Sequence, residues 1–80
     1  MTYNYSKLKG RMAELNYTQE KLAAEMGISA RSLSLKLNGI RTYTQRDIVS
    51  ACEALEIPHE EIPIYFFTPL VQQAEQPKGG

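Results

Sequence analysis

The chain has 80 residues, of which 42% are hydrophobic and 22% charged, and its nine basic side chains balance nine acidic ones. A chain of this length folds as one small domain that buries only about two-thirds of its unfolded surface. The single cysteine, Cys52, excludes an intramolecular disulfide framework and a cysteine-rich zinc site. No stretch has the ~18 to 20 apolar residues of a membrane span, and no signal segment opens the sequence. We therefore expect a cytoplasmic protein with no membrane partner.

The zero net charge hides a difference between the two halves of the chain. Residues 1–46 hold eight Lys and Arg against three Glu, whereas residues 47–80 hold one Lys against six acidic residues. A chain polarised in this way can present a basic face to a polyanion. The alternative is that these charged side chains are simply solvated and that their uneven distribution along the chain is coincidental. We favour the polarised interpretation because the basic half contains the motif described below.

The first predicted helix begins after Asn4, a residue suited to the N-cap position. Leu8, Met12 and Leu15 then recur at i, i+4 and i+7, which places them on one helix face. Asn16 suits a left-handed residue at the C-terminal end. These signals predict one amphipathic helix before residue 17.

A second and a third helix follow after very short connections. Thr18 is the N-cap of the second helix, and Gly27 ends it because glycine adopts a left-handed conformation without penalty. Ser29 caps the third helix, which reaches Leu37 or Asn38. Only Gly-Ile-Ser separates the two helices.

The fourth helix is the most strongly marked. Thr44 is its N-cap, and Asp47 stands at the third position, where an acidic side chain favours the first turn. Its predicted inner face consists of Ile48, Ala51, Cys52 and Leu55. Pro58 then begins a short fifth turn through Glu61, and Pro63 stops it.

Beyond Pro63 the composition changes. Residues 64–71, "IYFFTPLV", are apolar and aromatic, and we expect an extended C-terminal arm, followed by a disordered polar tail over 72–80. Tyr65, Phe66 and Phe67 could fold back onto the core or form a dimer contact, and we favour the dimer. The sequence thus predicts an all-α fold of four to five short helices over 1–63 with a helix-turn-helix, plus the arm.

The segment from Thr18 to Gly39, "TQEKLAAEMGISARSLSLKLNG", carries the functional argument. A three-residue turn fixes two helices at a steep angle, as in a helix-turn-helix. With Leu33 pointing inward, the opposite face of the third helix carries Arg31, Ser34, Leu35 and Asn38. Arginine can bond guanine in two places, and an apolar group can contact the thymine methyl. The N-terminus of the second helix, with Thr18 and Gln19, is suited to bind a phosphate.

With "TQEKLA", "GIS", "LNG" and "DIVSACEALEI", residues 8–55 resemble the Cro and lambda-type helix-turn-helix repressors of phages. The "YFF" segment adds a resemblance to small phage-encoded repressors. The resemblance implies that Gln19 and Asn38 hold the DNA backbone. It also implies a set of residues that face the bases, namely Ala30, Arg31, Ser34 and Leu35.

One position departs from the pattern of that family. An apolar residue usually stands three after the position of Leu33, but here it is Lys36, and the apolar residue comes one later, at Leu37. We expect the third helix to be rotated slightly and Lys36 to contact a phosphate. Arg41 is expected to add diffuse attraction to the phosphates.

Each of these assignments has a plainer alternative. Arg31 could pair with a carboxylate on the surface, Leu35 could pack on a neighbouring element, and Asn38 could serve only as the helix C-cap. His59 has no metal-ligating neighbours at suitable spacing, so we expect neither a metal site nor a cofactor. With no nucleophile–base pair and no glycine-rich phosphate loop, we expect no enzymatic activity.

The sequence therefore predicts a DNA-binding transcriptional repressor of phage or prophage origin in the cytoplasm of a bacterial host. It would bind a pseudo-palindromic operator in double-stranded DNA as a homodimer, with the third helix of each copy in a major groove. The alternative is an antitoxin or an antirepressor-like protein-interaction module that uses the apolar arm to bind a protein partner, which the zero net charge favours.

Overall fold

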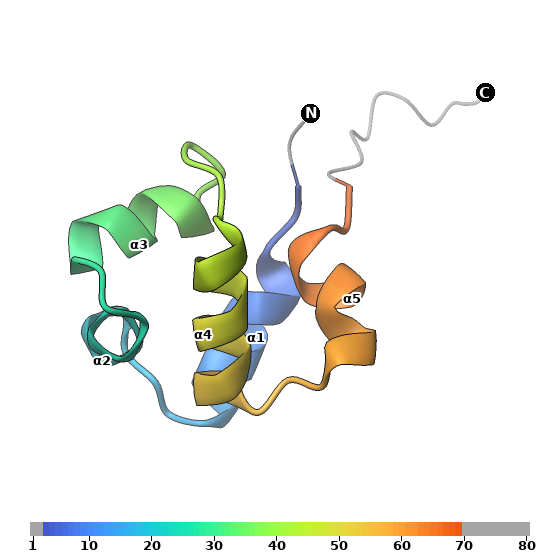
Figure 1. The fold of residues 1–80 in the computed structure, drawn as a ribbon, viewed down its shortest axis with the longest axis horizontal. Coiled ribbons are helices and arrows are strands. Elements are labelled where there is room, and N and C mark those ends of the chain that lie inside the picture. The colour runs from blue at the N-terminus through green and yellow to red at the C-terminus, as the bar shows by residue number, and fades with distance from the viewer. Residues whose placement is uncertain (1–2, 70–80) are drawn as a thin grey trace.

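The computed structural model describes residues 3–69, and the fold of these residues is all-α, as predicted (Figure 1). The helices are α1 (Ser6–Glu14), α2 (Gln19–Met26), α3 (Ala30–Leu37), α4 (Gln45–Leu55), the 3-10 turn η1 (His59–Glu61) and α5 (Ile62–Phe66). The described residues contain no strand beyond an isolated antiparallel bridge between Tyr3 and Pro69. No helix in this part of the chain is long and apolar enough to cross a bilayer.

Three helices begin at the predicted caps. The hydroxyl oxygens of Thr18, Ser29 and Thr44 accept the backbone N–H three residues later, at 3.1, 3.0 and 3.0 Å respectively. At α4 the cap is reciprocal, because the carboxylate of Asp47 also accepts the backbone N–H of Thr44 at 2.8 Å. Each cap satisfies a donor that the helix itself leaves without a partner.

The ends of the helices depend on left-handed residues. Asn16 (φ 59°) and Gly27 (φ 76°) both take the predicted conformation. Glu56, which ends α4 with φ 57°, was not predicted, because no glycine or asparagine marks that position. The first helix begins at Ser6 rather than directly after Asn4, although the side chain of Asn4 does accept the Ser6 N–H at 2.8 Å.

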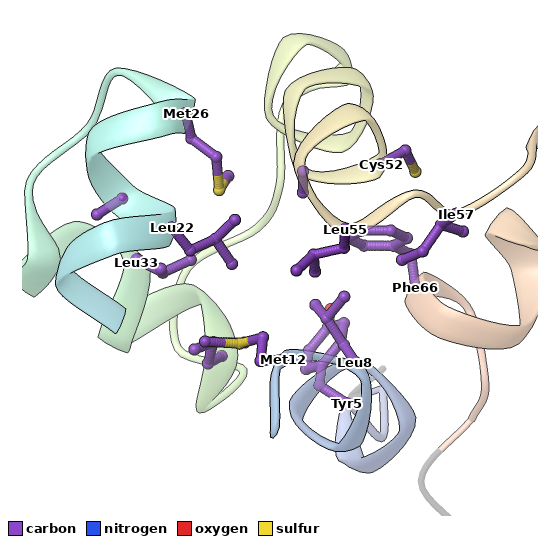
Figure 2. Packing of buried hydrophobic residues seen from close by; sticks show 13 residues of the cluster. Tyr5, Leu8, Met12, Leu22, Met26, Leu33, Cys52, Leu55, Ile57 and Phe66 are labelled. Carbon is purple, nitrogen blue, oxygen red and sulfur yellow. The ribbon is translucent and has the colours of Figure 1, made fainter. Parts of the chain in front are cut away.

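The core receives one fully buried large side chain from each of the five helices. These are Leu8, Leu22, Leu33, Leu55 and Phe66, each less than 2% exposed. In Figure 2 the leucines point toward one another from separate elements. Cys52 is 7% exposed and belongs to this cluster, which confirms its prediction as a core residue.

The C-terminal region differs from the prediction. Residues 64–66 are not extended: they lie in α5, and Pro63 stands in the first turn of that helix instead of ending one. Proline is well tolerated there because the first turn needs no N–H donor from it. Phe66 is 1% exposed, so burial of its ring against the core favours the helix over an extended arm. Residues 70–80, with the end of the predicted arm and the predicted tail, lie outside the described residues.

Helices α2 and α3 are steeply inclined to each other. Figure 1 views α2 almost along its axis, while α3 lies across the picture. The two helices stand at one end of the molecule, with α5 at the other and α1 and α4 between them (Figure 1). The buried Leu33 anchors α3, and Ile28 in the turn packs against the core. One side of α3 therefore faces away from the body of the protein.

The turn between α2 and α3 can be tested with a matched pair of glycine substitutions. A Cβ at either Gly27 or Gly10 would meet no atom within 4 Å, so packing does not distinguish the two sites. Gly27→Ala is expected to lower the free energy of unfolding by about 1 to 2 kcal/mol because of its positive φ. Gly10→Ala, inside α1, is expected to raise it by about 0.5 to 1 kcal/mol. Urea unfolding measures both, and equal effects of the two substitutions would contradict this explanation.

Candidate functional site

The outer side of α3 brings together four of the predicted contact residues. Arg31 and Asn38 are exposed, whereas Ser34 and Leu35 are half-buried. Their spacing of three, four and seven residues places them along one face of the helix. Arg31 forms no ion pair within residues 3–69, so its guanidinium is available for an external partner. This set of four residues is called the α3 outer face below.

Ala30 was predicted to accompany them. Its side chain is half-buried and packs against the hydrophobic core cluster. Less of its methyl group is therefore left for a contact outside the protein than the resemblance implied.

The residues predicted to contact phosphates, apart from Lys36, lie at helix ends or in the loop after α3. Thr18 is the exposed cap of α2, and Gln19 is the first residue of that helix. The Thr18 hydroxyl accepts the Lys21 N–H and can still donate its own proton. Asn38 is the exposed C-cap of α3, and Arg41 is exposed in the following loop, with its Nη1 3.3 Å from the Ser32 Oγ.

The prediction that Lys36 contacts a phosphate is wrong. Its Nζ lies 2.8 Å from the Asp47 Oδ2, and the two side chains are only 6% and 8% exposed. The same ammonium donates a hydrogen bond of 2.9 Å to the backbone oxygen of Thr42. Lys36 thus takes the inward position itself, beside the buried Leu37, and its charge is neutralised inside the protein.

Asp47 is held by more than its lysine partner. Burial by itself raises the pKa of this carboxyl group, but the hydrogen bonds from Lys36 and Thr44 outweigh burial and hold the pKa below the ordinary value of 3.8. A single carboxylate oxygen, Oδ2, lies at hydrogen-bond distance from both the Lys36 ammonium and the Thr44 N–H. The pair therefore connects α3, the loop over 38–44 and the first turn of α4.

Sequence reasoning missed this ion pair although a signal for it was present. A lysine at a position that usually holds an apolar residue indicates either a rotated helix or a buried charge. A buried lysine needs a carboxylate partner, and Asp47 was already placed in a capping arrangement nearby. A second missed contact is the 2.9 Å hydrogen bond from the Arg11 Nε to the backbone oxygen of Leu55, which ties α1 to the end of α4.

The three aromatic residues predicted as dimer contacts differ in their burial. Phe66 is buried in its own core at 1% exposure and cannot contact a second copy, so that assignment is wrong. Tyr65 is half-buried and packs against the core. Phe67 is 47% exposed, and its ring lies edge-on to that of Tyr3 at a centroid distance of 5.6 Å.

Comparisons with known proteins give a family and a similar solved structure. A family model described as "Protein of unknown function (DUF739)" matches residues 1–69. A solved structure, the modulator of repression (MOR) of the temperate bacteriophage TP901-1 from Lactococcus lactis, is similar to this chain with 42% sequence identity and a TM-score of 0.71. The similarity covers 90% of this chain and 97% of that one. No curated protein matches the sequence.

The Lys36–Asp47 pair is expected to contribute strongly to stability. Removing one partner of a buried ion pair costs about 3 to 5 kcal/mol because the other charge is left buried. Lys36→Met should therefore lower the free energy of unfolding in urea by roughly that amount. Lys9→Met is the matched control, since Lys9 is exposed on α1, and its effect should be within about 0.5 kcal/mol.

The same pair predicts a pH dependence with a definite sign. The pKa of Asp47 is lower in the folded protein than its ordinary 3.8. Its contribution to stability is therefore complete above that ordinary value and is lost as the pH falls through the lowered one. Urea unfolding between about pH 7 and about pH 2 should show a smaller loss of stability for Lys36→Met than for the unsubstituted protein or for Lys9→Met. Identical acid profiles would contradict this role of Lys36.

Proposed function

The chain belongs to the family described as DUF739, and from its similarity to the phage modulator of repression and from the α3 outer face we propose that it is a regulatory protein of a temperate phage or prophage that acts by binding DNA. The observation that carries the proposal is the division of α3 into two sides. Leu33, Lys36 and Leu37 hold its inner side in the protein, while the α3 outer face is turned away from them. A surface helix anchored so firmly on one side is suited to docking as a rigid unit.

In the proposed complex, α2 and α3 act as a helix-turn-helix, with α3 in the major groove. The N-terminal residues of such a helix reach the base edges, and Arg31 is the second residue of α3. Its guanidinium suits the two acceptors of a guanine, and Leu35, one turn later, suits a thymine methyl. Ser34 can donate to or accept from either kind of base pair.

Contacts to the DNA backbone would come from both sides of α3. Thr18 and Gln19 offer polar side chains beside the N-terminal amides of α2, where the helix dipole favours an anion. Arg41 and Arg46 are exposed cations after α3. Counter-ion release from a few such contacts makes the affinity depend on salt. The proposal includes two copies on a pseudo-palindromic site, for which the exposed Ile64 and Phe67 supply apolar surface.

A second candidate function is a protein-interaction modulator, in which the same end of the molecule binds a repressor protein. It is favoured by Ile40, which is 73% exposed in the loop directly after α3. The burial of Lys36 adds to this, because Arg31 is then the only cation that α3 exposes. The similar phage protein is a modulator of repression, a role compatible with either DNA or a repressor as the target.

Selection from a randomised duplex pool at two salt concentrations tests the DNA-binding proposal. The unsubstituted protein should enrich an inverted repeat with half-sites about one helical turn apart. Arg31→Ala should relax one position of each half-site and cost about 1 to 3 kcal/mol per half-site. Lys9→Ala removes the same charge from α1 and should leave the selected sequence unchanged. If the unsubstituted protein enriches no sequence at either salt concentration, the DNA-binding proposal fails.

The second candidate is tested by calorimetric titration of the chain into purified repressor proteins of temperate phages. Ile40→Asp should weaken that binding at least tenfold, because a charge replaces an apolar side chain in the contact. Val49→Asp, at a 42% exposed apolar residue on α4, is the matched control and should not. If the chain binds a repressor but selects no DNA sequence, the modulator function replaces the DNA-binding one. Loss of affinity in both variants would contradict a contact at Ile40.

A further inference from the structure

A pocket of about 160 Å³ opens between the N-terminal segment, the loop over 38–44, α4 and α5. Its wall includes the buried Tyr5 and Phe66 and the half-buried Tyr43. The ring centroids of Tyr5 and Tyr43 are 5.0 Å apart, and those of Tyr43 and Phe66 are 5.1 Å apart. We call this the aromatic pocket. Its volume suits a single ring, since an engineered cavity of about 150 Å³ in another protein binds benzene.

Tyr43 lines the aromatic pocket, and its hydroxyl is a polar group for which the described residues supply no partner. The oxygen atom is buried and has no hydrogen-bond partner within residues 3–69. Burial, followed by the nearby Tyr5 and Asp47, raises the pKa of Tyr43, so the hydroxyl keeps its proton and can donate it. A buried donor without an acceptor is unfavourable, and a ligand that brings an acceptor would remove that cost.

Arg41 is the one charged residue among those that line the aromatic pocket. Arg41 lines the pocket, is exposed, and forms no ion pair with any described carboxylate. The other lining residues, which include Gly39, Thr42 and Ile48, carry no charge. A ligand that combines an aromatic ring with an anionic group therefore matches both parts of the lining.

We propose that the aromatic pocket binds a small aromatic carboxylate, with the ring among Tyr5, Tyr43 and Phe66 and the carboxylate toward Arg41. An acceptor on this ligand takes the hydrogen bond from Tyr43. Apolar walls with a few placed polar groups are the usual composition of a small-molecule site.

The loop that lines the aromatic pocket also holds α3. The Arg41 N–H donates to the backbone oxygen of Leu35 at 3.2 Å, and the Arg41 side chain donates to the Ser32 Oγ at 3.3 Å. The Thr42 oxygen accepts from Lys36. A ligand that contacts Arg41 and Thr42 therefore acts on the residues that fix α3. Its binding would change the position of the α3 outer face. This last step rests on the proposed function, whereas binding itself does not.

The test is an NMR titration of the full chain with benzoate and with its neutral analogue benzamide. Benzoate should give saturable shifts, with a Kd of the order of 1 mM or below, in the rings of Tyr5, Tyr43 and Phe66. Amide shifts over residues 32–36 should follow the same curve if the pocket and α3 are coupled. Because these shifts need no DNA, the pocket can be established even where the DNA-binding proposal fails.

Two variants assign the polar contacts. Arg41→Gln should weaken benzoate about tenfold while leaving benzamide unchanged, because only the charge-assisted bond is lost. Tyr43→Phe should weaken both probes by roughly two- to tenfold. Arg46→Gln, an exposed arginine outside the lining, is the control and should change neither. Tyr43→Phe is expected to fold, since it removes an unpartnered hydroxyl, and the amide spectrum verifies this.

The proposal is overturned if neither probe produces saturable shifts in the three rings. It is also overturned if the shifts survive both Arg41→Gln and Tyr43→Phe, which would place benzoate elsewhere on the surface. Ring shifts without shifts over residues 32–36 would establish the pocket and overturn its coupling to α3.

Discussion

The ion pair between Lys36 and Asp47 is the interaction on which the geometry of this protein depends. A single carboxylate caps α4 and neutralises a lysine from α3, and that lysine also binds the loop between the two helices through the Thr42 carbonyl. An apolar side chain at position 36 could fill space but could not fix the loop. Burial of the two charges has an unfavourable desolvation free energy, but the pair fixes the orientation of α3.

The helix boundaries follow from local chemistry, which explains why the sequence predicts most of them. Caps such as Thr44 and left-handed positions such as Gly27 act within three or four residues, so they can be read without knowledge of the fold. The course of the chain after Pro63 could not be read in this way. "IYFF" suits a strand by its composition, and its helical conformation depends on a core that accepts the ring of Phe66.

In the candidate site, too, local spacing predicts some features, while others depend on the tertiary fold. Helical spacing from Leu33 places Arg31, Leu35 and Asn38 on the outer side, because a period of 3.6 residues needs no tertiary information. The role of Lys36 could not be fixed by that period. Whether a lysine at the edge of an inner face reaches solvent or turns inward depends on a carboxylate eleven residues later, and only the packing of α3 beside α4 brings the two together.

The bridge between Tyr3 and Pro69 joins the two ends of the described chain, and the Asn4 N–H donates to the Thr68 oxygen at 2.7 Å beside it. Such contacts of long sequence separation gain little until the rest of the fold has formed. The N-terminal segment and α5 should therefore detach and reattach as one cooperative unit, with amide hydrogen exchange faster than that of the α2–α4 region. Each opening would expose Phe66. A cellular protease or chaperone would therefore act first on the N-terminal segment and α5 rather than on α3.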